Sequence, residues 1–139
     1  MRGNVLTEKY LLDTSALYPL VLQLREEFLE YTAIFTVLEQ AFYEVGNTIL
    51  ERISERQDLG PIVVAKLFQE TLDNIYVLRI KDGPHEIMEL SINEDLAFYD
   101  AAYLFATRRY RVKLVAEDSD LLKFPGSITI KQLIRELKK

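Results

Sequence analysis

Apolar residues along the chain occur either in short continuous runs or at helical spacing. The runs predict buried strands at residues 10–13, 33–36, 75–80, 112–116 and 127–130. Spacing near 3.6 residues predicts one or two helices over 15–30, interrupted by Pro19. It predicts further helices over 37–53, 61–73 and 84–91, and one that Asn93 caps and that runs to about residue 109. A short helix is expected just after residue 120, and a terminal helix from residue 131. Strands separated by helices pair in parallel through crossovers. The pattern therefore predicts an α/β fold, a three-layer α/β/α sandwich around a central, mainly parallel sheet.

Composition limits the chemistry that this chain can perform. Its 139 residues are 49% hydrophobic and contain no repeat, which predicts one domain over residues 1–139. The absence of Cys excludes disulfides, thiolate nucleophiles and Cys-type metal sites. A single histidine, His85, excludes zinc sites with several imidazoles, and its place after Gly83-Pro84 predicts an exposed turn or helix start. Carboxylates, hydroxyls, Lys, Arg and Tyr remain.

Charge and hydrophobicity also bear on location and partners. No stretch has a signal-peptide core or the roughly 20 apolar residues of a membrane span, so we expect a cytoplasmic protein that does not enter membranes. The net charge of −5 argues against broad non-specific binding of nucleic acid. A local basic rim around an acidic centre is still compatible with this charge.

Three aspartates follow predicted strands. Asp13 ends the first apolar run, and Asp118 and Asp120 follow the run over 112–116. The carboxyl ends of parallel strands meet at the sheet edge where α/β proteins place their ligands, so we expect these carboxylates to converge. The alternative for Asp13 is a helix N-cap, and for the other two a capping turn.

Two further acids lie in predicted helices. Asp100 is the only acid in the apolar segment 96–106, and a lone buried carboxylate costs several kcal/mol unless it is protonated, paired or bound to a cation. A salt bridge to Arg108 or Arg109, or a Tyr hydrogen bond, would be the structural alternative. Glu44 borders an apolar stripe, a common place for solvated or capping glutamates, with Asn47 one turn on.

Together these acids favour metal chemistry. Clustered carboxylates repel one another unless a divalent cation neutralises them, and hard oxygen ligands select Mg²⁺ or Mn²⁺. Such a site activates a water for attack on a phosphodiester. The residues alone therefore predict a nuclease. A metal-free hydrolase with two acids roughly 5 to 10 Å apart, such as a glycosidase, stays open as a weaker hypothesis.

Four segments resemble, in order, the acidic motifs of PIN-domain proteins, with the VapC-type toxin ribonucleases most similar. They are 11–17 (LLDTSAL), 43–47 (YEVGN), 98–103 (FYDAAY) and 114–121 (LVAEDSDL). The resemblance implies a PIN-like domain that acts as a divalent-metal-dependent endoribonuclease, hydrolysing RNA phosphodiesters through a metal-activated water. It implies a catalytic quartet of Asp13, Glu44, Asp100 and Asp118, with Asp120 as an auxiliary metal ligand. Supporting roles follow by position for Thr14, Ser15 and Asn47.

The resemblance also implies partners. It predicts a homodimer, an RNA substrate and a small antitoxin protein that inhibits by entering the acidic cleft. Ala116 is a departure, because many relatives have Thr or Ser there, and loss of that hydroxyl predicts weaker metal binding or slower turnover. The alternatives are therefore an inactive PIN-like module that binds protein or RNA, and an RNA-processing nuclease that is not a toxin.

Other residues allow two interpretations each. Arg108, Arg109, Arg111 and Lys113 could line an RNA path or form a solvated helix end. Tyr99 and Tyr103 could stack on bases, but their apolar surroundings favour packing in the core or in a dimer.

Overall fold

The computed structural model describes residues 9–52, 60–80 and 83–139. The elements follow in the order β1 (Tyr10–Leu12), α1 (Thr14–Leu24), the 3₁₀ helix η2 (Arg25–Tyr31), β2 (Phe35–Leu38), α2 (Ala41–Arg52), α3 (Pro61–Leu72), β3 (Tyr76–Leu78), α4 (Pro84–Glu94), α5 (Phe98–Tyr110), β4 (Lys113–Val115), α6 (Ser119–Leu122), β5 (Ser127–Ile128) and α7 (Ile130–Leu137).

The strands of the described residues form one five-stranded sheet of order β3-β2-β1-β4-β5. Every pairing is parallel, with Leu11 opposite both Thr36 and Leu114. The central strands β1 and β4 are buried along most of their length, which explains why they appear in the sequence as continuous apolar runs rather than as alternating ones. The predicted parallel α/β sheet is confirmed.

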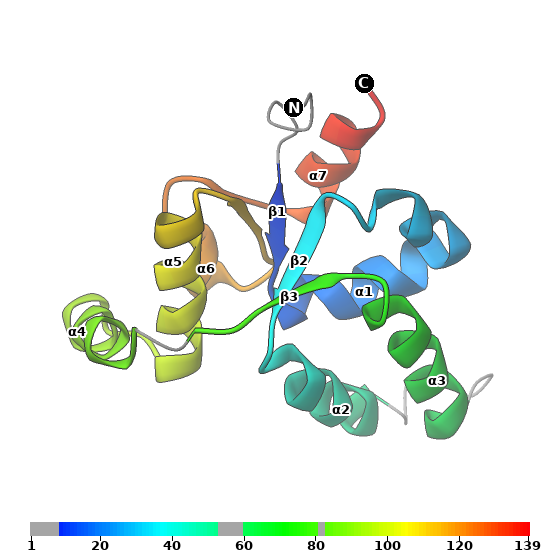
Figure 1. Cartoon of the computed structure of the whole chain (residues 1–139), viewed down its shortest axis with the longest axis horizontal. Helices are drawn as coiled ribbons and strands as arrows, with labels where there is room; N and C mark the ends of the chain where they lie inside the picture. Colours follow the sequence, from blue (N-terminus) through cyan, green and yellow to red (C-terminus); the bar gives the residue numbers. More distant parts are fainter. Residues whose placement is uncertain (1–8, 53–59, 81–82) are drawn as a thin grey trace.

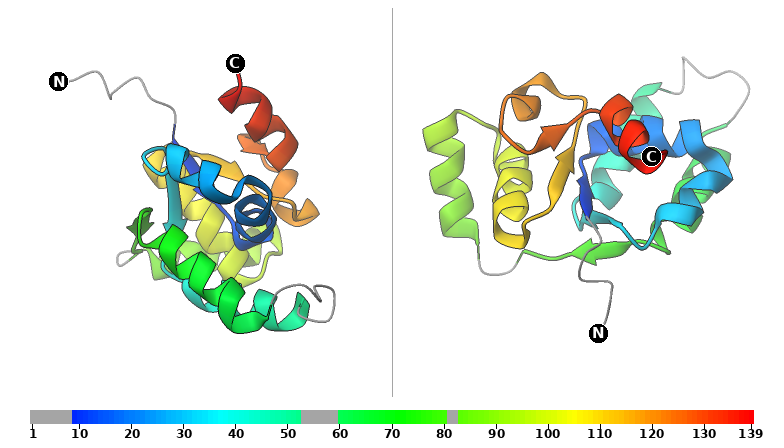
Figure 2. Two further views of the ribbon diagram at one scale, coloured as in Figure 1. Left: turned by 90° about the vertical axis from the view of Figure 1, so that its right-hand side faces the viewer. Right: turned by 90° about the horizontal axis from the view of Figure 1, so that it is seen from above.

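Helices cover both faces of this sheet, as Figure 1 shows with the strands between two helical layers. One apolar cluster joins alternate strand residues such as Leu12 and Val37 to α1, η2, α2, α3 and α7. The other joins Leu11 and Leu114 to α4, α5 and α6. In Figures 1 and 2, α4 is outermost and packs against α5 rather than on the sheet. No helix in the described ranges has the length and apolar character to cross a membrane.

Pro19 does not interrupt the first helix, contrary to prediction. It lies inside α1, where its missing N–H removes one main-chain hydrogen bond. Leu17, Leu20 and Val21 around it are fully buried, and this packing outweighs the lost bond. The break comes instead at Arg25, whose φ of 52° ends α1 and starts η2.

Two predicted helix starts were wrong. Val37 and Leu38 have helical spacing with later residues but belong to β2, which is held between β1 and β3, and α2 begins only at Ala41. The predicted end of that helix, Ile53, lies outside the described residues. Asn93 does not cap a helix; it lies within α4, which ends at the left-handed residue Asp95. Helix α5 then begins at Phe98.

We expect two glycine-to-alanine substitutions to have opposite effects. A Cβ at Gly83 would lie 2.6 Å from the buried Phe105 ring, so Gly83→Ala should lower the free energy of unfolding by about 1–3 kcal/mol. A Cβ at Gly46, within α2, meets nothing within 4 Å, and Gly46→Ala should raise stability by about 0.5–1 kcal/mol. Urea unfolding of both variants tests this, and equal shifts would contradict it.

Candidate metal and active site

The candidate site lies where the strand order of the sheet reverses. From β1 the chain continues to β2 on one side, whereas β4 pairs with the other side of β1. Helices on opposite faces diverge at such a point and leave a crevice at the carboxyl ends of the strands. Asp13 leaves β1 and Asp118 follows β4 at this edge, and the Asp13 N–H donates to the Val115 carbonyl at 3.0 Å.

Asp13 is held in a desolvated position. Its side chain is 6% exposed, and it makes no capping hydrogen bond although it stands at the N-cap of α1. Burial raises its pKa from the usual 3.8 to about 6, the Ser15 hydroxyl opposes this, and the charges of Glu44 and Asp100 add to the rise. Capping of α1 therefore does not explain why a carboxylate is buried at this position.

Ser15 connects the two strand ends. Its hydroxyl donates to Asp13 Oδ2 and accepts a hydrogen bond from the Glu117 N–H at 3.0 Å. The hydroxyl therefore orients the Asp13 carboxylate and ties the loop after β4 to the start of α1. This contact agrees with the supporting position that the resemblance implies for Ser15.

Three carboxylates come together on the other side of the crevice. One oxygen from each of Asp100, Asp118 and Asp120 lies within 4.8 Å of the other two. Asp118 also caps α6, since its Oδ1 accepts from the Asp120 N–H at 2.9 Å. The predicted capping turn is thus present, and it brings the two aspartates together beside Asp100. We name Asp100, Asp118 and Asp120 the aspartate trio.

Asp100 is placed differently from the prediction. Because α5 starts at Phe98, Asp100 lies in the first helical turn, where the helix dipole favours negative charge. Arg108 is eight residues further along, about 12 Å at the helical rise, and so lies at the other end of α5. Burial raises the pKa of Asp100, and the charges of Asp118, Asp120 and Glu44 raise it further. A salt bridge to Arg108 does not explain this acid.

Glu44 comes from the first turn of α2 and is held by two hydroxyls. Thr14 Oγ1 and Tyr103 Oη each donate to Glu44 Oε1 at 2.8 Å. Tyr103 is fully buried, as the core-packing interpretation predicts, and burial followed by the charges of Glu44 and Asp13 raises its pKa, so the phenol stays protonated. The sequence offered Tyr103 as a base-stacking or packing residue and did not predict its hydrogen bond to Glu44. Its spacing of three residues from Asp100 on one helix could have indicated a place near the acids.

The four acids expected to form a quartet are near one another but do not form one compact group. Asp13 and Glu44 lie outside the aspartate trio. Beyond the effect of burial, the charges of Glu44 and Asp100 raise the pKa of Asp13, and the charge of Glu44 raises that of Asp100. A cavity of about 380 Å³ is lined by Asp13, Glu44, Asp118 and Asn47, with Arg52 among its other residues. Asp120, expected as an auxiliary metal ligand, belongs to the trio, and its part in metal binding stays a prediction.

The basic residues considered for an RNA path lie elsewhere. Lys113 begins β4, at the opposite edge of the sheet from Asp118, and forms an ion pair with Glu136 at 3.2 Å. Arg108 and Arg109 occupy the last turn of α5. His85 is exposed at the start of α4, as predicted, and its Nδ1 lies 3.4 Å from Glu89 Oε1.

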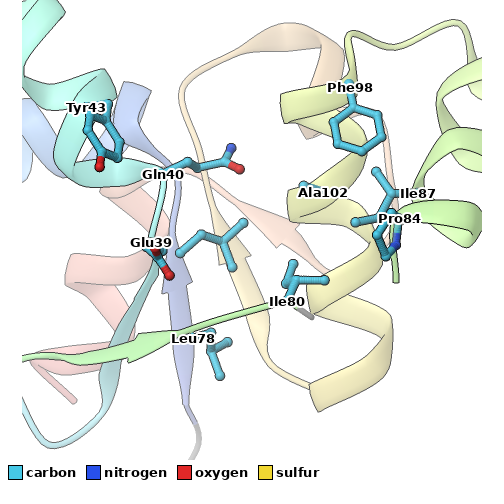
Figure 3. Close-up of a pocket in the computed structure, with 10 residues that line it drawn as sticks. Glu39, Gln40, Tyr43, Leu78, Ile80, Pro84, Ile87, Phe98 and Ala102 are labelled. Carbon is cyan, nitrogen blue, oxygen red and sulfur yellow. The ribbon is translucent and has the colours of Figure 1, made fainter. Parts of the chain in front are cut away.

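A separate apolar pocket of about 390 Å³ is lined by residues of β2, β3, α4 and α5, among others (Figure 3). Tyr43 and Phe98 stand on opposite walls with the Gln40 side chain between them, and Gln40 Nε2 donates to the Tyr99 carbonyl at 3.3 Å. None of the predicted acids lines this pocket. Tyr99 is 61% exposed, so it does not pack in the core of this chain, and its packing in a dimer stays a prediction.

The donors at the sheet edge fit a hard divalent cation. The aspartate trio offers carboxylate oxygens close enough to share one ion, and Asp13 and Glu44 add charge nearby. Mg²⁺ and Mn²⁺ prefer such oxygen ligands. A cation would also relieve the repulsion that raises the pKa of Asp13 and Asp100.

Comparison with known proteins identifies relatives of this chain. No protein-family model matches it. It is 28% identical over 134 residues to a protein named exonuclease VapC9 of Pyrobaculum aerophilum, covering 93% of this chain and 96% of that one. The crystal structure of PAE2754 from the same organism matches with a TM-score of 0.83 and 25% identity, over 94% of this chain and 97% of that one.

The chain is similar to VapC9 over most of its length and has a PIN-like fold. Two further structures share the fold. A toxin–antitoxin complex from Klebsiella pneumoniae has a TM-score of 0.64 at 18% identity, with 87% of this chain and 97% of that one covered. DNA-bound VapBC from Salmonella typhimurium has a TM-score of 0.62 at 14% identity, with 88% and 97% covered. The resemblance to VapC-type proteins is confirmed.

Ala116 marks where this chain departs from the pattern that the resemblance implies. The residue is fully buried in the apolar cluster beneath α5, and its N–H donates to the Ile128 carbonyl at 3.0 Å. It provides no hydroxyl near the trio. Its effect on metal binding stays a prediction.

We expect the buried Asp13 to make stability depend on pH. Because its folded pKa of about 6 exceeds the usual 3.8, the folded state binds more protons between these values, so stability falls as pH rises from about 4 to about 6. Asp13→Asn should then stabilise the metal-free protein at pH 7 by up to about 3 kcal/mol, and by little at pH 4. Urea unfolding at both pH values in EDTA measures this, and a difference independent of pH would contradict it.

Proposed function

We propose that this protein is a divalent-metal-dependent endoribonuclease and the toxin of a toxin–antitoxin pair. The observation that carries the proposal is the aspartate trio at the topological switch point of the sheet, with Asp13 and Glu44 beside it. Homology to a protein named exonuclease VapC9 supports a nuclease, and the fold shared with a toxin–antitoxin complex supports the biological role.

Each acid has a proposed part in the chemistry. Asp100, Asp118 and Asp120 would hold Mg²⁺ or Mn²⁺, with Asp13 and Glu44 as further ligands, directly or through water. When bound, the cation would polarise a phosphoryl oxygen of RNA and lower the pKa of a water that attacks phosphorus. The grouping of the trio, and the cavity that Asp13 and Glu44 line together with Asp118, support these roles.

The protein's own groups prepare this site. Ser15 orients Asp13, and the hydroxyls of Thr14 and Tyr103 orient Glu44. Near pH 6 the Asp13 carboxyl is half protonated without a cation, so cation binding must displace a proton and should weaken below that pH. Asn47 is exposed on α2 and lines the cavity, which supports a proposed contact with substrate or a metal-bound group.

We expect Asp100→Asn to abolish RNA cleavage, because it removes one negative charge of the trio. The fold should be preserved, because Asp100 is partly exposed in the first turn of α5. A circular RNA tests the endonuclease proposal directly, since an exonuclease finds no end on it. The wild type should cut circular RNA with Mg²⁺ or Mn²⁺ and not with EDTA. Asp73→Asn, an exposed aspartate after α3, is the matched control and should cut normally.

The outcomes of that assay are distinct. Cleavage of linear RNA alone would replace the endonuclease proposal by the exonuclease activity that the VapC9 name describes. Cleavage of circular DNA but not of RNA would overturn the RNA assignment. Activity that survives EDTA would favour a metal-free hydrolase. An active Asp100→Asn variant would remove the trio from the mechanism.

We expect Asp120→Asn to weaken Mn²⁺ binding at least tenfold, because it removes one of three clustered carboxylates. Isothermal titration calorimetry of the purified protein measures this affinity. Asp95→Asn, at the left-handed end of α4, is the control and should bind as the wild type does. Unchanged affinity in Asp120→Asn would mean that Asp120 is not a ligand and that the metal is held by Asp13, Glu44, Asp100 and Asp118.

An antitoxin partner and a homodimer belong to the same proposal. Both come from the resemblance, and the toxin–antitoxin complex among the structural neighbours supports the antitoxin. A second candidate is an inactive PIN-like module that binds protein or RNA, which the missing hydroxyl at Ala116 favours. Failure of the wild type to bind Mn²⁺ and to cut RNA would select that candidate, and restored activity in Ala116→Thr would identify its cause.

A further inference from the structure

One oxygen of Glu44 receives two hydroxyl protons. Thr14 Oγ1 and Tyr103 Oη each lie 2.8 Å from Glu44 Oε1, and the two hydroxyls lie 3.4 Å apart. A hydroxyl has a single proton to donate, so both protons are committed to this oxygen. Hydrogen bonds to a carboxylate are shorter and stronger than those between neutral groups. The pair leaves Glu44 Oε2 for another partner.

The three residues of this contact come from three elements that each carry a candidate ligand. Thr14 directly follows Asp13 at the start of α1, Glu44 is itself an acid of α2, and Tyr103 lies one helical turn after Asp100 in α5. A contact among them therefore relates the positions of acids that are far apart in the sequence.

We propose that Tyr103 is a positioning residue of the metal site, which with Thr14 holds Glu44 by Oε1 so that Oε2 faces the cation. This inference rests on the proposed function. Packing alone does not require the hydroxyl, because a phenylalanine ring would fill nearly the same buried space as the ring of Tyr103. A buried hydroxyl is costly unless it is hydrogen-bonded, and here its partner is an acid of the site.

Tyr103→Phe tests the inference, with Tyr10→Phe as a matched control. Tyr10 is also buried and also donates to a glutamate, Glu136 Oε1 at 2.6 Å, but at the opposite end of β1. Calorimetry with Mn²⁺ should show about 10- to 100-fold weaker binding for Tyr103→Phe, the usual loss when a ligand's supporting hydrogen bond is removed. Tyr10→Phe should bind Mn²⁺ as the wild type does.

Substitutions at Thr14 provide a second readout that does not depend on Tyr103. Thr14→Val keeps the shape of the side chain and removes the hydroxyl, so it should also weaken Mn²⁺ binding. Thr14→Ser keeps the hydroxyl and should bind Mn²⁺ with an affinity close to that of the wild type. In cleavage assays, Tyr103→Phe should need more metal for half-maximal rate while the KM for RNA stays unchanged. A role in packing alone would not produce this dependence on the hydroxyl.

The results separate this inference from the proposed function. Wild-type affinity for Mn²⁺ in Tyr103→Phe, or equal losses in Tyr103→Phe and Tyr10→Phe, would overturn the positioning role and leave the nuclease proposal standing. If Tyr103→Phe does not fold, Thr14→Val against Thr14→Ser decides, and equal affinity in those two overturns the inference. A wild type that neither binds Mn²⁺ nor cuts RNA would overturn both.

Discussion

Repulsion among carboxylates at one edge of the sheet is the constraint around which this structure is arranged. Asp13 is almost fully buried and Asp100 is partly buried, and the pKa of each is raised by burial and by neighbouring acids. Such a cluster opposes folding at neutral pH. A protein keeps it when the same charges serve a function, here proposed to be the binding of a divalent cation.

The fold tolerates the cluster because nearby donors hold most of its acids. A serine hydroxyl binds Asp13, two hydroxyls bind Glu44, a main-chain N–H binds Asp118, and a helix amino terminus lies under Asp100. Most of these donors come from first helical turns, and Tyr103 comes from the second turn of α5. The two apolar clusters fix these helices against opposite faces of the sheet. Core packing thus provides the rigidity that a site of like charges requires.

Fold and function rest on different observations in this protein. The PIN-like architecture follows from the parallel sheet and from the match to PAE2754. An architecture of this kind can carry unrelated activities, so the function depends on the chemistry of the site. Homology to VapC9 and the grouping of hard oxygen donors point in the same direction, and this agreement is what supports a metal-dependent nuclease.

The sequence by itself determined the layer architecture, the order of the strands along the chain and the acids at the ends of β1 and β4, because these depend on local apolar runs and on the residues that end them. It did not determine where α2 and α5 begin, since Val37 and Leu38 fit either a helix or a strand until β2 pairs with its neighbours. The late start of α5 moved Asp100 into a first turn. Only the tertiary structure joined Asp120 to Asp100 and placed the Tyr103 hydroxyl on Glu44, because such contacts depend on how distant elements pack and not on spacing within one of them.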